Sequence, residues 1–246
     1  MADIVVGADG CPAGWLAVTM PSGRPAKARA SLVSRAADLL AESQADPIAV
    51  AIDIPIGLMD RPEDRPRPPD RAARRFLQAC NADGLTGVGS RVFAAPCRAH
   101  LDRFRADPDY TAFRAAFPPP RSLSKQAWFI CAKIAELDDL CRSRPSAPIW
   151  ESHPEIAFAA AAGRTLPPKK RPAGAAARVQ VLEDLGFNLG RLSDGLPKGR
   201  KHWAPDDLLD ACILAQTASR IAAGRHSGLP NLTDSDSRRL RRAIFY

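Results

Sequence analysis

The sequence is poor in aromatic residues and has no long apolar run, and each shortage excludes a class of protein. Of its 246 residues, 6% are Phe, Trp or Tyr, so a surface that stacks successive bases of a single strand is not indicated. No window reaches the roughly 18–20 consecutive apolar residues that a membrane helix needs. An apolar fraction of 46% and a charged fraction of 25% exclude wholesale disorder and fibrous architectures.

The six cysteines form no CxxC pair and the four histidines are scattered, so no zinc site is indicated. The segment MADIVVGADGC runs directly into an apolar strand pattern, with no basic leader, long apolar stretch or cleavage site. We therefore expect reduced, buried thiols in a cytoplasmic protein that has no membrane partner. The sequence does not determine the oligomeric state.

Basic residues exceed acidic ones, 35 against 27, which gives a net charge of +8. Such an excess favours a nucleic-acid partner, DNA or RNA, or else a basic surface that keeps the protein dissolved. Because aromatic residues are few, nucleic acid would be held by contacts to phosphates. The basic residues cluster at 61–75, 169–171, 198–201 and 238–242.

Apolar periodicity predicts an α/β fold. Strands are expected over 4–9, 15–18, 28–33, 48–54 and 147–151, the first two as a hairpin and 48–54 as a central strand. Helices are expected over 34–42, 72–80, 109–117, 123–141, 154–162, 173–185 and 205–223, and the tail is expected to be helical over 235–243.

This order predicts one mixed sheet with helices on both faces. The length suits a single domain over 1–246. Residues 56–120, rich in proline, are expected to form an insertion after the fourth strand, and residues 225–246 a basic C-terminal tail.

Four aspartates stand where propensity does not favour them: Asp9 and Asp53 at strand ends, and Asp207 and Asp210 in the first turns of the last helix. Asp207 and Asp210 are three residues apart and head an apolar stripe, so they should face the sheet. Gathered carboxylates repel one another unless a cation lies between them. Their oxygens are ligands for Mg²⁺ or Mn²⁺, and two such ions about 3.5–4 Å apart can cleave phosphodiesters.

Each aspartate also has a structural interpretation. Asp9 could begin an Asx turn with Gly10. Asp53 could pair with an arginine, and Asp206 and Asp207 could complement the helix dipole.

A second polar group is Trp150-Glu151-Ser152-His153-Pro154-Glu155. Glu151 and His153 leave a strand on one face, which favours a site role for both, His153 as a proton relay or metal neighbour. Alternatively His153 is structural, and Ser152 with Glu155 forms a capping box for the next helix.

Most candidate substrate contacts lie outside these two groups. Lys170 and Arg178 could bind phosphate, whereas Lys169 is interpreted as a solvated surface lysine. Ser90, Arg91 and Gln126 could meet a substrate if the insertion folds over the site, and Glu155 is the remaining candidate.

Several segments together resemble domain-of-unknown-function family 429, described as predicted ribonuclease H-like nucleases: VGADGCPAGW, VAIDIPIGL, GSRVFAAP, LSKQAW, WESHPE, PKKRPAG and DDLLDA. The resemblance implies a ribonuclease H-like fold with a five-stranded mixed sheet of order 3-2-1-4-5. It also implies that Asp9, Asp53, Asp207 and Asp210 occupy metal-ligand positions. Glu151, His153 and Glu155 fall on the family's E-x-H-P-E motif, and Lys170 and Gly174 on its K-K-x-x-x-G segment.

The leading hypothesis is therefore hydrolysis of nucleic acid that depends on Mg²⁺ or Mn²⁺, with two ions held by Asp9, Asp53, Asp207 and Asp210. Glu151 and His153 would assist near the metal. One alternative is phosphotransfer from ATP, or nucleotide binding, on the related actin and sugar-kinase core. Another is a non-catalytic module that binds a structural ion or a ligand.

Overall fold

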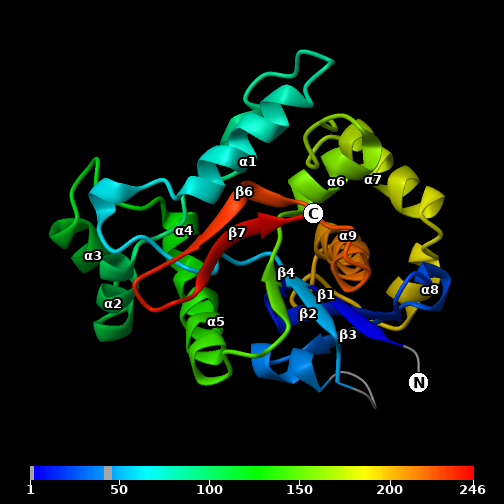
Figure 1. Ribbon diagram of the computed structural model, residues 1–246, viewed down its shortest axis with the longest axis horizontal. Coiled ribbons are helices and arrows are strands. Elements are labelled where there is room, and N and C mark those ends of the chain that lie inside the picture. Colours follow the sequence, from blue (N-terminus) through cyan, green and yellow to red (C-terminus); the bar gives the residue numbers. More distant parts are fainter. Residues whose placement is uncertain (1–2, 42–45) are drawn as a thin grey trace.

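The central sheet has five strands in the order β3-β2-β1-β4-β5 (Figure 1). The computed structural model describes residues 3–41 and 46–246. The strands are β1 Ile4–Cys11, β2 Gly14–Pro21, β3 Arg29–Val33, β4 Ala49–Ile52 and β5 Ile149–Glu151. β1 pairs antiparallel with β2 and parallel with β4, β2 pairs antiparallel with β3, and β4 pairs parallel with β5. The predicted mixed sheet and its order are confirmed.

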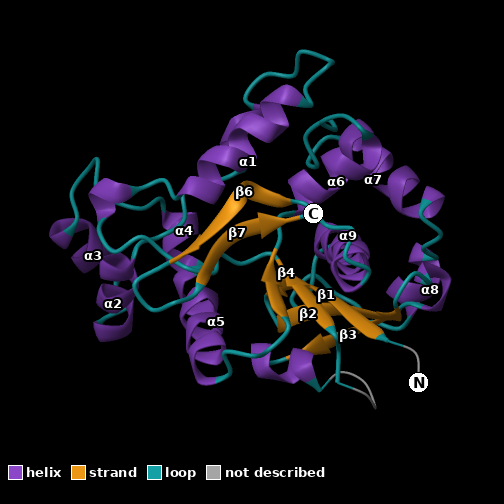
Figure 2. Cartoon of the chain, in the orientation of Figure 1, coloured by secondary structure: helices purple, strands orange, loops and turns teal. Residues whose placement is uncertain are grey.

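Helices lie on both sides of this sheet, as expected (Figure 2). The α-helices are α1 Pro68–Ala79, α2 Arg98–Ala106, α3 Tyr110–Ala116, α4 Lys125–Phe129, α5 Cys131–Ser143, α6 Pro154–Ala162, α7 Pro172–Asp184, α8 Leu189–Asp194 and α9 Pro205–Ala222. Short 3-10 helices are η1 Pro25–Lys27, η2 Ala36–Leu40, η3 Pro62–Asp64 and η4 Val88–Arg91. A second sheet is the antiparallel hairpin of β6 Gly228–Ser235 and β7 Arg241–Phe245.

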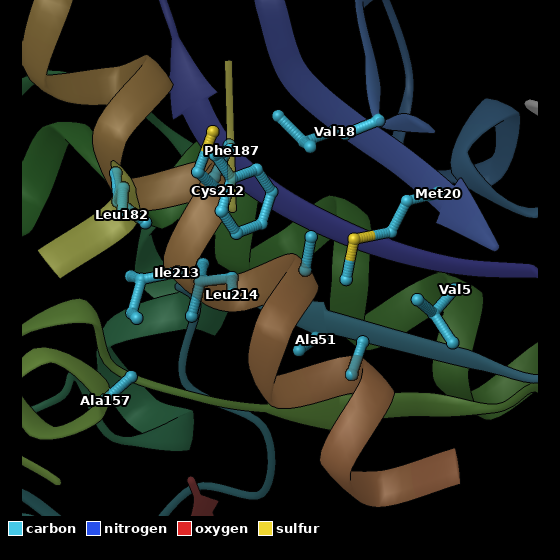
Figure 3. Close-up of a cluster of buried hydrophobic side chains, with 14 of the residues drawn as sticks. Val5, Val18, Met20, Ala51, Ala157, Leu182, Phe187, Cys212, Ile213 and Leu214 are labelled. Carbon is cyan, nitrogen blue, oxygen red and sulfur yellow. The ribbon is translucent and has the colours of Figure 1, made fainter. Parts of the chain in front are cut away.

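The alternation of side chains along β1 divides the core into two halves. Val5 packs on one face in a cluster with residues of α9 and α6 to α8, which includes Cys212, Ile213 and Leu214 (Figure 3). Val6 packs with α5, η2 and the insertion on the other face. Because side chains alternate with a period of two residues, a strand covered on both faces is apolar throughout.

Helix α9 lies directly on β1 because Gly7 has no side chain. A Cβ atom at Gly7 would lie 2.0 Å from the Ala215 nitrogen and 2.3 Å from the Ala211 oxygen. Such distances are far below van der Waals contact, so only glycine permits this approach. The position of α9 relative to the carboxyl ends of β1 and β4 therefore depends on one missing methyl group.

Several predicted elements differ from those observed. The helix expected over 123–141 is two helices, α4 and α5, which meet at Ile130. The segment 34–42 contains only η2, and its expected last residue, Glu42, lies outside the described residues. Helices α2 and α8 were not predicted, because short amphipathic segments among prolines and glycines give a weak periodic signal.

The prediction of a helical tail over 235–243 is wrong, because β6 and β7 occupy this region. Asp236 fixes the turn between them by accepting hydrogen bonds from the nitrogens of Arg238 and Leu240. β7 also forms a parallel bridge to Ser152, next to β5. Tertiary pairing has thus overridden local helix propensity.

Helices α1 to α3 and the 3-10 helices η3 and η4 fall within residues 56–120, where the insertion was expected. All six cysteines are free, and five of them are buried. None of the described helices combines the length and the apolar character needed to cross a membrane.

We expect Gly7→Ala to destabilise the protein by about 3 kcal/mol or more, because the added methyl group overpacks the β1–α9 contact. Chemical denaturation followed by circular dichroism measures the change. Gly190→Ala in α8 is the matched control, since its Cβ atom would meet only the Asn188 side chain, at 3.7 Å. Equal stability of the two variants would contradict the assigned role of Gly7.

Candidate functional site

The four predicted aspartates come from three elements that meet at one end of the sheet. Asp9 lies near the end of β1 and Asp53 directly after β4, and the Asp53 nitrogen donates a hydrogen bond of 3.2 Å to the Ala8 oxygen. Asp207 and Asp210 lie in the first two turns of α9, which packs on β1. Asp210 is buried and the other three are half-buried.

The electrostatics show that these carboxylates act on one another. Desolvation and the charges of Asp210, Asp53 and Asp207 raise the pKa of Asp9 well above its ordinary value. Desolvation also raises the pKa of Asp53, and it raises the pKa of Asp210 to about 6. Within the described part of the chain, none of the four forms an ion pair with an arginine. We call Asp9, Asp53, Asp207 and Asp210 the acidic cluster.

Lys169 is the cation that the acidic cluster holds. Its Nζ atom donates a hydrogen bond of 2.7 Å to Asp210 and lies 3.1 Å from Asp206. The interpretation of Lys169 as a solvated surface lysine is therefore wrong, and its exposed neighbour Lys170 is the one that faces solvent. Two consecutive lysines in a loop look alike in the sequence, and only the docking of that loop on α9 distinguishes them.

Two aspartates also accept hydrogen bonds from nearby backbone nitrogens, although the Asp9 bond goes to the next residue and is not the suggested Asx turn. The Asp207 carboxylate accepts a hydrogen bond of 2.8 Å from the Ala204 nitrogen and so caps α9. The Asp9 carboxylate accepts one of 2.7 Å from the Gly10 nitrogen. Each group therefore has one oxygen anchored by the backbone, and this fixes the direction of the side chain.

His153 and Glu155 border the cluster. The charge of His153 lowers the pKa of Asp53, and the charge of Glu155 raises it. His153, and not Ser152, caps α6, because its Nδ1 atom accepts a hydrogen bond of 3.2 Å from the Glu155 nitrogen. The predicted Ser152–Glu155 capping box is therefore absent. The Ser152 hydroxyl donates instead to the Phe245 oxygen, at 2.7 Å.

Glu155 joins two arginines that the sequence offered as substrate contacts. Its carboxylate accepts hydrogen bonds from Arg91, at 2.8 Å, and from Arg178. Arg91 also donates to the Leu166 oxygen, and Arg178 to the oxygens of Pro167 and Gly174. Both guanidinium groups are thus engaged in fixing the loop that carries Lys169.

Glu151 does not share these contacts. Arg67 donates hydrogen bonds of 2.5 and 2.9 Å to its two carboxylate oxygens, and the Ile56 nitrogen donates one of 2.6 Å. Burial raises the pKa of Glu151, and Arg67 acts in the opposite direction. Arg67 also binds Asp70, so Glu151 belongs to a buried ion-pair network that joins α1 to β5.

The two other candidate substrate contacts, Ser90 and Gln126, are exposed. Ser90 donates its hydroxyl to the Gly87 oxygen, at 2.7 Å. Gln126 is exposed on α4. Neither contacts the acidic cluster.

Lys133 was missed by the sequence analysis, which saw only a helix residue there. Its Nζ atom donates to the Gly14 oxygen in the β1–β2 turn and lies 4.4 Å from the centre of the Trp15 ring. The charge of Lys133 lowers the pKa of Asp207. No spacing in the sequence relates α5 to this turn, so no local signal could have identified it.

The chemistry of the acidic cluster suits a divalent cation, because its donors are hard carboxylate oxygens and negative charge exceeds positive charge. Among residues 3–41 and 46–246, however, no three His, Cys, Asp or Glu side chains are arranged closely enough to enclose an ion. Instead, the Lys169 ammonium group is hydrogen-bonded to the Asp210 carboxylate. Ion binding at Asp210 would therefore require Lys169 to withdraw.

The fold and the cluster define an α/β protein whose polar site lies at the carboxyl ends of adjacent parallel strands. Residues 7–234 match a protein family described as "Protein of unknown function (DUF429)". The chain belongs to this family. Comparison with curated proteins and comparison with solved structures give no match.

We expect acidification to stabilise the metal-free protein through the cluster. The folded-state pKa of Asp210, about 6, lies above the ordinary value of 3.8, so the folded state binds the proton more tightly and stability falls as pH rises through this window. Lowering the pH from about 7 to about 5 should therefore contribute about 1 kcal/mol of stability through Asp210. Denaturation in the presence of a chelator measures it.

Asp210→Asn should show a smaller gain over the same pH range, because asparagine does not ionise. Asp184→Asn, at an exposed position in α7, is the control and should keep the gain of the unaltered protein. An equal pH response in all three proteins would refute the assignment to Asp210.

Proposed function

We propose that this protein hydrolyses phosphodiester bonds of nucleic acid with the help of Mg²⁺ or Mn²⁺ bound at the acidic cluster. The observation that carries the proposal is the excess of negative charge: desolvated carboxylates from β1, β4 and α9 meet, their charges raise the pKa of Asp9 and Asp210, and the Lys169 ammonium group binds Asp210. Proteins rarely retain uncompensated buried charge unless a ligand offsets it.

The topology supports the same proposal. The strand order, with acids at the ends of β1 and β4 and at the head of α9, agrees with the ribonuclease H-like arrangement that the sequence resembles. The basic surface suits a polyanionic substrate. Lys170 and Arg171 are exposed next to Lys169 and offer positive charge beside the site.

The residues divide the work as follows. Asp9, Asp53 and Asp210 would hold the cation, and Asp207 would remain the cap of α9 with its charge directed at Asp9. A bound divalent cation lowers the pKa of water and offsets charge on the phosphate. His153 accepts the Glu155 N–H at Nδ1, so the neutral ring carries its proton on Nε2, from which it would donate a hydrogen bond to a group bound beside Asp53.

Glu151 takes no part in this proposal, because its carboxylate is engaged by Arg67. Glu155, Arg91 and Arg178 act as positioning residues that hold the Lys169 loop against α6 and α7. Phosphotransfer from ATP and a purely structural ion remain the competing proposals, and the experiments below separate them.

We expect metal-dependent cleavage of branched, single-stranded or hybrid oligonucleotides by the purified protein, and loss of at least about 100-fold in rate for Asp9→Asn and Asp53→Asn. The control is Asp184→Asn, which should cleave at the normal rate. Gel analysis of labelled substrates with Mn²⁺ gives the rates. Cleavage that persists in both site variants would refute the proposal, whereas ATP turnover without nucleic-acid cleavage would support phosphotransfer.

We expect Lys169→Gln to increase the dependence of stability on divalent cations, because the acidic cluster then lacks its internal ammonium group. The melting temperature of this variant should rise more with Mn²⁺ than that of the unaltered protein. Lys170→Gln is the matched control, since Lys170 is the exposed neighbour. Equal Mn²⁺ responses in the two lysine variants would contradict the assignment of Lys169 as the group that a bound cation replaces.

A further inference from the structure

A cavity of about 540 Å³ lies at the edge of the sheet, away from the contacts of the acidic cluster. Its walls are the end of α5, strand β5 and the β6–β7 hairpin, and β7 lies beside β5 (Figure 1). Five arginines line it: Arg142, Arg144, Arg238, Arg239 and Arg241. This volume is in the range of small-molecule sites.

The acidic residues of the cavity are already paired with arginines that do not line it. Glu151 pairs with Arg67 at 2.5 Å, and Asp234 pairs with Arg242 at 2.8 Å. The positive charges of the arginines that line the cavity are only partly balanced by nearby carboxylates. In the described residues, Arg144, Arg239 and Arg241 form no ion pair within 4.0 Å.

The other two arginines of the cavity have only long contacts to acids. Arg142 lies 3.9 Å from Asp138 and 3.8 Å from Asp139. Arg238 lies 3.6 Å from Asp102 and 3.7 Å from Asp138. Asp138 is already bound by Arg98, so it cannot balance both. The cavity therefore has a net positive lining.

Arg241 is held in place by aromatic rings and not by a carboxylate. Its guanidinium carbon lies 4.1 Å from the centre of the Trp150 ring and 5.4 Å from that of Phe245. Although the residue as a whole is exposed, burial of the group against these rings lowers its pKa. A desolvated guanidinium without a carboxylate leaves its N–H donors available to a ligand.

The hairpin turn that carries Arg238 and Arg239 is rigidly fixed. Asp236 accepts backbone hydrogen bonds from Arg238 and Leu240 with one oxygen, and one of 3.0 Å from the Leu58 nitrogen with the other. Arg239 has a φ of 63°, in the left-handed region that disfavours arginine. The backbone positions of both arginines are therefore set before a ligand binds, which reduces the ordering cost of binding.

We propose that this cavity binds a compact oligophosphate, such as the diphosphate or triphosphate group of a nucleotide or inorganic polyphosphate. Guanidinium groups converge from α5 on one side and the hairpin on the other, which suits a ligand with two or more anionic groups. The Trp150 face is covered by Arg241, so stacking of a base there is not part of the proposal. The site is separate from the proposed hydrolytic function.

The test is isothermal titration calorimetry of the full chain with inorganic tripolyphosphate and pyrophosphate, in the presence of a chelator so that no metal complex binds at the acidic cluster. We expect saturable binding to one site, weakened about tenfold or more by Arg241→Gln and by Arg144→Gln. Arg114→Gln, an exposed arginine on α3 that removes the same charge, should bind normally.

Circular dichroism and melting temperature establish that each variant is folded. If Arg241→Gln does not fold, Arg144→Gln at the end of α5 decides the matter, because the Arg144 side chain forms no hydrogen bond or ion pair with the described residues. Absence of binding, or equal weakening by Arg114→Gln, would overturn the proposal. The proposal would also be overturned if the protein bound a single-stranded oligonucleotide but not tripolyphosphate, and if tripolyphosphate did not displace that oligonucleotide.

Discussion

The close approach of α9 to β1 is the constraint on which the site depends. Gly7 allows the backbone of α9 to lie directly on β1, and this brings Asp207 and Asp210 close to Asp9, near the end of β1. The parallel pairing of β1 with β4 adds Asp53 at the same edge. Packing between backbones, not attraction between the polar groups, therefore assembles charges that repel one another.

Several ion pairs and hydrogen bonds around the acidic cluster offset the repulsion between its carboxylates. Lys169 offsets part of the charge, and the loop that carries it is held by Glu155 through Arg91 and Arg178. Backbone nitrogens bind one oxygen each of Asp9 and Asp207. Hydrogen bonds thus fix the groups around the site, whereas the carboxylates of the acidic cluster retain an excess of negative charge. This arrangement is expected where a ligand supplies the positive charge.

The molecule concentrates opposite charges in two separate places. Carboxylates gather at the carboxyl ends of β1 and β4, whereas arginines of α5 and the β6–β7 hairpin gather at the β5 edge. Between them Arg67 bridges the carboxylates of Glu151 and Asp70, and this buried network ties the insertion to the sheet. Charges that are paired hold the fold together, and charges that are unpaired mark the places where ligands are proposed.

The sequence alone predicted the mixed sheet, its order through the family resemblance, and the four aspartates as one group, because apolar runs, turn residues and misplaced acids are local signals. It did not distinguish Lys169 from Lys170, separate Glu151 from His153, or foresee the hairpin of β6 and β7. Those outcomes depend on which distant segments dock together. Ion pairing and strand pairing are decided by contacts between residues far apart in the chain, and no periodicity along it records them.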